Sequence, residues 1–395
     1  MRFISQNMVY IYTSLWVLYL LQNLLLLRGP IAQLILATIF VISFYAFFQV
    51  NLYYKTSPYL KWLNVMLLIL TIYGLIPILG GEVIHKNGNV DNVTYNYYYL
   101  QKIYRSVLPI YAFYYFAIKG QISARNTFLL FGAILICSIL MFYQSFQISS
   151  EKFDKEEVTN NIGYVFVPLI LMLYVLKVKI IWKYLLLSVI FFYIMMSIKR
   201  GAILAGSLAL LSFMTFQLKT VTKKQVVYIL ALSAIALVAV IRFITNLYET
   251  SPYFRVRLER TLRGDSSGRD LMYSHYMDYF ISKTTPMEFL FGHGAAGTIK
   301  IFGQWAHNDW LEFAINQGVL GMMLYLIYWM VFVCAWKNYH GPEEYKRALR
   351  DCILVYSLIA IFSMSFSGMP LAATLCIGYC LAYNESALSL QENEY

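Results

Sequence analysis

The feature of this sequence that most constrains its fold is a series of apolar runs, most of them close to 20 residues long. A helix needs about 20 apolar residues to cross the hydrocarbon core of a bilayer. Only 13% of the residues are charged, about half the share of a soluble domain, and 60% are hydrophobic. The sequence therefore predicts an all-α integral membrane protein with about twelve transmembrane helices. The predicted spans are residues 8–27, 31–50, 60–80, 100–118, 127–145, 161–177, 179–198, 201–218, 225–244, 309–336, 351–367 and 369–384.

Basic residues are concentrated in alternate short loops, and this pattern predicts the orientation of the spans. With the N-terminus in the cytoplasm, the inside loops hold Arg2, Lys55, Lys61, Lys119, Arg125, Lys177, Lys179, Lys183, Lys219, Lys223, Lys224, Lys337, Lys346, Arg347 and Arg350. The opposite loop at 151–157 is mixed and largely acidic. Both termini are therefore predicted to be cytoplasmic. The chain divides into spans one to nine (1–244), one long extracytoplasmic loop between spans nine and ten (245–306) and spans ten to twelve (307–395).

Two places carry positive charge on the outer side. Lys199 and Arg200 lie where the seventh span meets the eighth, and the loop 245–306 is rich in basic residues. Long loops translocate despite their charge, so the orientation stands. An anionic partner on the outer face is the simplest reason for the charge. The basic residues of the loop are Arg255, Arg257, Arg260, Arg263, Arg269, Lys283 and Lys300.

Each basic site has a structural and a functional interpretation. Lys199 and Arg200 could reach lipid phosphates, or they could bind a phosphate group of a substrate. The Gly264–Leu271 segment should form a turn followed by a helix that begins near Arg269, an unfavourable helix position for a cation. Arg269 is therefore a candidate for binding a ligand. The arginines from 255 to 263 recur every two or three residues, which fits either a solvated helix face or an anion-binding face. We expect the loop as a whole to pack on the bundle as short helices.

The stretch from Phe291 to Gly321 contains two motifs. Gly292, Gly294 and Gly297 spell G-x-G-x-x-G, but a dinucleotide site needs a strand before it, so we expect a tight turn. His307 and Asn308 then precede the tenth span. Asp309 and Glu312 form a D-x-x-E pattern that could cap this helix. His307 would lie just outside the membrane beside the arginine-rich loop, where a neutral imidazole could accept a proton.

Several chemistries are not indicated. The five cysteines, Cys137, Cys334, Cys352, Cys376 and Cys380, lie in or beside apolar runs and are expected to be small buried side chains. The sequence has no P-loop and no zinc-protease or lipase motif. We therefore expect no metal and no cofactor, and we expect no nucleic acid as a partner because the charge follows the membrane topology.

The three sites together resemble the O-antigen polymerase and ligase superfamily. Lys199-Arg200-Gly201 is similar to a Ser-Arg-Gly-like element at a span junction, although Lys199 stands where the family often has Ser. Ser267-Gly268-Arg269 through Tyr276 is similar to a Gly/Ser turn followed by an arginine and an aromatic helix. The segment from Gly292 to Gly321 is similar to a G-x-G turn followed by H-N-x-x-L-E. The resemblance covers roughly residues 195–325.

The resemblance implies a metal-independent, inverting glycosyltransferase with a GT-C-like fold in a bacterial cytoplasmic (inner) membrane, with its active site facing the periplasm or outside. Its donor would be an undecaprenyl-pyrophosphate-linked glycan and its acceptor a second glycan, with membrane lipids around them. Arg200 and Arg269 would bind the pyrophosphate and His307 would activate the acceptor hydroxyl. The other candidate substrate-binding residues are Lys199, Arg255, Arg257, Arg260, Arg263, Tyr273 and Asn308.

The first hypothesis for function is polymerisation of lipid-linked repeat units into O-antigen or capsular polysaccharide. A ligase that transfers the glycan to lipid A-core or another acceptor is the nearest alternative, because both would share the donor site. A polysaccharide flippase or transporter is the alternative from another class, although its charges would be expected in a central cavity. A chain-length regulator and a flippase are further partners to consider for a polymerase.

Overall fold

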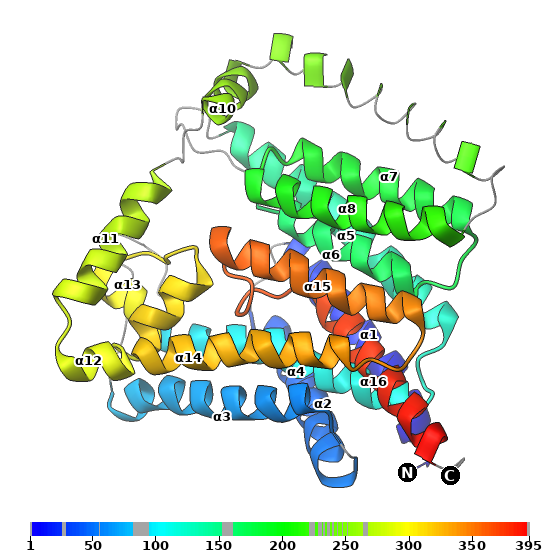
Figure 1. Cartoon of the computed structure of the whole chain (residues 1–395), viewed down its shortest axis with the longest axis horizontal. Helices are drawn as coiled ribbons and strands as arrows, with labels where there is room; N and C mark the ends of the chain where they lie inside the picture. The colour runs from blue at the N-terminus through cyan, green and yellow to red at the C-terminus, as the bar shows by residue number, and fades with distance from the viewer. Residues whose placement is uncertain are drawn as a thin grey trace. The chain divides into compact units, whose positions relative to one another are not determined.

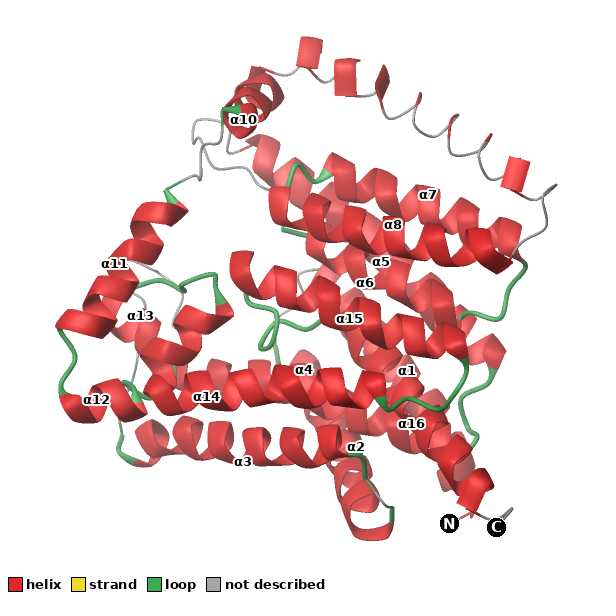
Figure 2. Ribbon diagram, viewed as in Figure 1, coloured by secondary structure: helices red, strands yellow, loops and turns green. Residues whose placement is uncertain are grey.

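The computed structural model describes residues 2–25, 29–54, 56–81, 95–151, 161–220, 252–263 and 268–392, with separate residues between 226 and 250. Throughout these ranges the regular secondary structure is helical and contains no strand (Figures 1 and 2). Five helices are long and apolar enough to cross a membrane: α2 (Pro30–Tyr53), α3 (Pro58–Leu79), the Ala124–Ser145 part of α5 (Ala124–Glu151), the Arg200–Lys219 part of α8 (Arg200–Thr220) and α14 (Asp309–Lys337). This confirms an all-α chain of membrane-spanning character.

The other predicted spans also fall on helices, with one exception. They correspond to α1 (Arg2–Leu24), α4 (Tyr95–Ile118), α6 (Gly163–Val175), α7 (Ile180–Met196), α15 (Glu343–Phe362) and α16 (Leu371–Glu392). The predicted span at 225–244 lies mostly outside the described residues. The number of spans, the orientation of the helices and the GT-C-like arrangement therefore stay predictions.

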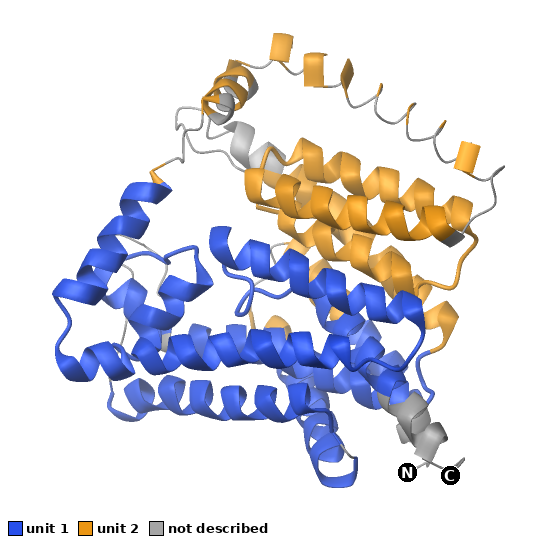
Figure 3. Cartoon of the chain, viewed as in Figure 1, with its two compact units in different colours: residues 1–15, 33–122, 269–395 blue, residues 16–32, 123–268 orange. Residues whose placement is uncertain are grey.

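The chain forms two compact units (Figure 3). Unit 1 contains residues 1–15, 33–122 and 269–395, and unit 2 contains residues 16–32 and 123–268. The boundary at 268 falls inside the loop that the sequence predicts as one extracytoplasmic segment. The topological division into 1–244, 245–306 and 307–395 stays a prediction, since it concerns the membrane.

Unit 1 is organised around α4, which packs against α3 and α16. All residues of α4 from Ser106 to Phe116 are buried, although the first turns of the helix are polar. Gly378 of α16 lies against the backbone of Ile110, so close that a Cβ there would overlap with it. α14 packs against α3 and α15 in the same unit. The polar start of α4 also contacts α14, because the side-chain amide of Gln317 donates to the Tyr99 hydroxyl at 2.7 Å.

In unit 2, α6 packs against both α7 and α8, which also pack against each other. Every residue of α6 is buried except Tyr164 and Val165. The junction of α7 and α8 is tight, because Ile198 has a φ of 51° and Ser197 Oγ accepts from the backbone N–H of Lys199 at 3.2 Å. Gly163 at the start of α6 leaves room for the Ser197 side chain.

The described parts of the arginine-rich loop are short helices, as the sequence predicts: α10 (Pro252–Leu262), α11 (Arg269–Ser282), α12 (Pro286–Phe291) and α13 (Gly297–Phe302). The helix expected near Arg269 begins at that residue. The expected glycine turn is also present, because Gly292 and Gly294 have φ angles of 73° and 85°. α11, α12 and α13 all pack against α14.

A break at Gly318 divides α14 into two parts. The backbone N–H groups of His293 and Gly294 donate to the carbonyls of Ile315 and Asn316, each at 2.9 Å, so the glycine turn satisfies the end of the first part. The second part runs from 319 to 337 and is about 28 Å long, close to the thickness of the hydrocarbon core. The first part, residues 309–317, contributes side chains to the pocket described below.

Candidate functional site

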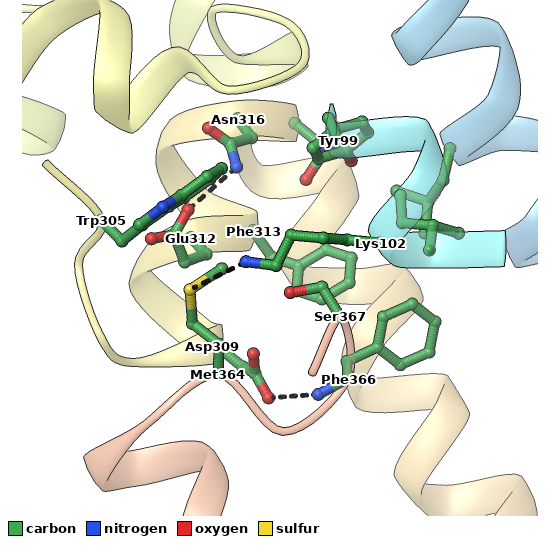
Figure 4. Close-up of a pocket in the computed structure, with 13 residues that line it drawn as sticks. Tyr99, Lys102, Trp305, Asp309, Glu312, Phe313, Asn316, Met364, Phe366 and Ser367 are labelled. Carbon is green, nitrogen blue, oxygen red and sulfur yellow. Dashed lines mark hydrogen bonds between the residues drawn. The ribbon is translucent and has the colours of Figure 1, made fainter. Parts of the chain in front are cut away.

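A pocket in unit 1 lies beside the first part of α14 (Figure 4). Its empty volume is about 390 Å³, which includes space open to solvent. α3, α4, α14, residue 305 and the 364–367 loop after α15 contribute its walls. The lining combines polar groups with aromatic rings, a mixture that suits a ligand with both polar and apolar surfaces. The polar side chains are those of Tyr99, Lys102, Trp305, Asp309, Glu312, Asn316, Gln317 and Ser367.

The Asp309 carboxylate anchors the loop that follows α15. Its Oδ2 accepts hydrogen bonds from the hydroxyl of Tyr325 (2.9 Å), the backbone N–H of Ser365 (2.8 Å), the hydroxyl of Ser365 and the backbone N–H of Phe366 (3.0 Å). The side chain is 2% exposed. Four donors offset the cost of burying the charge. Asp309 therefore holds the 363–367 loop against α14.

Glu312 has a similar role toward the segment before α14. Its carboxylate accepts from the Thr298 hydroxyl (2.8 Å), the Ala306 backbone N–H (2.6 Å) and the Asn316 side-chain amide (3.1 Å). The capping interpretation of Asp309 and Glu312 is wrong. The cap is Asn308, whose Oδ1 accepts from the backbone N–H of Leu311 at 3.1 Å. Both carboxylates instead fix distant backbone, which shapes the pocket.

Lys102 reaches the pocket from the second turn of α4. Its Nζ lies 4.4 Å from the ring centre of Trp305 and 5.4 Å from that of Tyr98, and it donates to the Met364 sulfur at 3.9 Å. Both ring contacts are within the range of cation–π attraction. No described carboxylate lies within 4.0 Å of the ammonium group, even though Asp309 and Glu312 line the same pocket.

Arg269 and His307 belong to one cluster at the end of α15. Arg269 Nη1 donates to the Phe362 carbonyl at 2.7 Å, and the Tyr273 hydroxyl lies 3.1 Å from the His307 carbonyl and 3.2 Å from the Ile361 carbonyl. Asn308 Nδ2 also donates to the Ile361 carbonyl, at 3.1 Å. The last carbonyls of a helix lack intrahelical partners and carry partial negative charge, so these donors cap α15.

This cluster is adjacent to the pocket. Ser363, which follows Phe362, begins the loop that Asp309 holds, and His307 lies between Trp305 and Asp309 in the chain. His307 is exposed and has a φ of 51°, a strained conformation for a side chain other than glycine. Burial raises the pKa of Tyr273, and the Arg269 guanidinium opposes that rise. The Arg269 charge thus acts on the Tyr273 hydroxyl, which donates to the backbone carbonyl of His307.

Arg200 and Lys199 form a separate group in unit 2. Arg200 is the first residue of α8, as Arg269 is of α11. Lys199 Nζ lies 5.9 Å from the ring centre of Tyr164. The structure thus brings together four of the predicted residues, Arg269, Tyr273, His307 and Asn308, within unit 1.

The arginines of α10 also belong to unit 2. Arg255 donates to the backbone carbonyls of Tyr248 (3.0 Å) and Glu249 (3.2 Å), so part of its guanidinium is occupied by the preceding residues of the chain. Arg260 and Arg263 are exposed, and Arg263 lies 3.9 Å from Glu259. The side chain of Arg257 and the residues 264–267 lie outside the described part of the chain. Their predicted roles stay predictions.

Lys102, Trp305 and Ser367 were not among the candidate residues that the sequence indicated. The only signal was that Lys102 lies in the first turns of a predicted span, where a charge is costly unless it serves a purpose.

Among the residues the structure describes, no group of three or more His, Cys, Asp and Glu side chains is placed to hold a metal ion. Comparison of the chain with known protein families and with curated proteins finds no match.

Proposed function

We propose that this protein polymerises lipid-pyrophosphate-linked oligosaccharide repeat units by inverting glycosyl transfer. The observation that carries the proposal is the cluster at the end of α15. Arg269 and His307 come from separate sequence motifs, yet Arg269 donates to the Phe362 carbonyl while Tyr273, one turn further along α11, donates to the backbone carbonyl of His307. A cation and a base of this kind are the two groups that a metal-free transfer of a sugar from pyrophosphate needs.

In the proposed reaction, the acceptor hydroxyl oxygen attacks the anomeric carbon of the donor sugar. The bond from that carbon to the pyrophosphate oxygen breaks, and the His307 imidazole takes the proton of the attacking hydroxyl. Negative charge then grows on the leaving lipid pyrophosphate. A guanidinium group, that of Arg269 in this proposal, stabilises that charge with paired hydrogen bonds.

The positions of the two arginines support an anionic ligand. Each is the first residue of a helix, where the helix dipole repels a cation and attracts an anion. Arg269 has five N–H donors, and its contacts with Phe362 and Tyr273 leave others available. A pyrophosphate at this position would be favoured both by the guanidinium and by the start of α11.

The test uses purified full-length protein in lipid nanodiscs with a lipid-linked repeat unit as the only substrate. We expect polymer to form in the presence of EDTA. Arg269→Lys keeps the charge but loses the planar fork, and His307→Gln removes the base, so each should lower kcat by about 100-fold or more. Lys283→Gln is the matched control, because Lys283 is exposed and, among the described residues, its ammonium group pairs only with Asp278, at 3.7 Å.

Three outcomes would refute the proposal: a strict requirement for a divalent metal, full activity of both variants, or failure of the wild-type protein to extend any repeat. Each variant must elute from size-exclusion chromatography as the wild type does before its rate is compared. Deletion of the gene separates the two enzymatic hypotheses. Short glycans on the final acceptor indicate a polymerase, and long glycans left on the lipid carrier indicate a ligase.

A further inference from the structure

The pocket beside α14 contains a positive charge without a contacting negative group. The contacts of Lys102 Nζ among the described residues are with the rings of Tyr98 and Trp305 and with the Met364 sulfur. A thioether is a weak hydrogen-bond acceptor, and an ammonium group has three donors. In Figure 4 the side chains of Lys102, Trp305 and Ser367 point into the same space. The ammonium group can therefore donate hydrogen bonds to an acceptor atom of a ligand in the pocket.

The neighbouring carboxylates do not replace that missing acceptor. Asp309 already accepts from four donors and Glu312 from three, and none of these donors is Lys102. Both carboxylates are held in place by backbone N–H groups, so they cannot turn toward Lys102 without leaving buried donors unsatisfied. The attraction between Lys102 and these carboxylates thus acts over a distance and not through contact.

A second observation in the same pocket points to a ligand. The Ser367 hydroxyl oxygen is buried and has no hydrogen-bond partner, although Ser367 lines the pocket. An unpartnered buried hydroxyl costs free energy, and a ligand oxygen in the pocket would recover it. Lys102 and Ser367 come from α4 and from the 363–367 loop, which Asp309 fixes. One cavity is thus lined by an ammonium group whose only acceptor among the described residues is a weak one, the Met364 sulfur, and by a hydroxyl group with no partner.

We propose that this pocket binds an acidic sugar of the glycan, with Lys102 Nζ and the Ser367 hydroxyl donating to the sugar carboxylate. The inference rests on the proposed function and adds a substrate class to it. A sugar carboxylate brings a single negative charge to walls that also hold Asp309 and Glu312. A phosphate or pyrophosphate carries more charge, so the same two carboxylates would repel it more strongly. The Phe313 and Phe366 rings suit the apolar faces of a sugar.

The first experiment measures binding, which does not depend on polymerase activity. Full-length protein in nanodiscs is titrated in a calorimeter with an oligosaccharide that carries one glucuronic acid, with its carboxyl-reduced neutral form and with inorganic phosphate. We expect the acidic oligosaccharide to bind at least 10-fold more tightly than the neutral one. Lys102→Gln should weaken binding of the acidic form by about 10- to 100-fold and leave the neutral form unchanged. Lys102→Arg should restore part of the loss.

Ser367→Ala gives a second variant that should fold normally, because the hydroxyl has no partner to lose. We expect it to weaken binding of the acidic form by about 2- to 10-fold. Lys283→Gln is the control for loss of a positive charge elsewhere. Equal binding of the acidic and neutral forms by the wild type, or equal effects of Lys102→Gln on both, would overturn the inference. Binding of phosphate with the same dependence on Lys102 would overturn it too, since it would assign the pocket to the pyrophosphate.

The polymerisation assay distinguishes this inference from the proposed function. Acidic and neutral repeat units extended equally well by the wild type and by Lys102→Gln would refute the acidic-sugar site and leave the polymerase standing. Binding that depends on Lys102, without polymer from any repeat unit, would refute the polymerase and retain the site as a binding site. A higher KM for acidic repeats alone, with kcat unchanged, would support both.

Discussion

The contact between the glycine turn and the break in α14 gives the sharpest test of how the site is built. Gly292 has φ 73° and ψ −171°, a region that only glycine adopts readily. A Cβ on Gly292 would overlap with the backbone of Asn316 and Gln317, and a Cβ on Gly318 would lie 2.5 Å from the Leu290 carbonyl carbon. The two backbones therefore approach each other at a distance that excludes a side chain on either glycine.

Gly292→Ala should cost about 4 kcal/mol. The backbone strain contributes about 1 to 3 kcal/mol. Separating the chains also breaks the hydrogen bonds from His293 to Ile315 and from Gly294 to Asn316, each 2.9 Å long and each contributing about 1 kcal/mol. Gly303 is the matched control, because it has a φ of 69° but open space around its Cβ position. Gly303→Ala should cost only about 1 kcal/mol, the left-handed strain alone.

The assay heats each variant in nanodiscs and follows the fraction that remains monodisperse on size-exclusion chromatography. At roughly 2 °C per kcal/mol for a chain of this size, Gly292→Ala should lower the midpoint by about 8 °C and Gly303→Ala by about 2 °C. Equal midpoints for the two variants would refute the reasoning. They would mean that the turn and α14 can separate at little cost.

Two further predictions use the same heating assay. Asp309→Ala leaves four donors without their acceptor and should cost about 4 kcal/mol or more, whereas Ser365→Ala removes one partner and should cost about 1 kcal/mol; similar losses would contradict the anchoring role of Asp309. Burial lowers the pKa of His293, whose side chain is 10% exposed. The unfolded chain therefore takes up a proton near the usual pKa of about 6.5 before the folded chain does, and stability should fall as the pH drops below that value. His293→Phe should reduce the fall in midpoint between pH 7.5 and 5.5, and identical pH profiles for variant and wild type would exclude His293 as its cause.

Local sequence patterns determined most of the helices and some of the site. Apolar runs near 20 residues predict helices because a membrane span must pair its own backbone N–H and C=O groups in hydrogen bonds, and a helix does so within the segment. The Gly/Ser segment predicted the helix that begins at Arg269, and the glycines at 292 and 294 predicted a tight turn, both of which the structure contains. These features depend only on neighbours in the chain.

The tertiary structure alone decided how the site is assembled. Asp309 and Glu312 looked like helix caps because their spacing fits one, yet their partners include Ser365 and Thr298, which no spacing within the helix can reveal. Lys102 lies in the first turns of a predicted span, and only the tertiary structure brings it to Trp305, about 200 residues away in sequence. The pattern of apolar residues along the chain is a local property of the sequence. The pairing of buried polar groups depends instead on which helices pack together. The pocket thus combines Asp309 and Glu312, which the sequence suggested as helix caps, with Lys102, whose place in a predicted span gave no indication of a role.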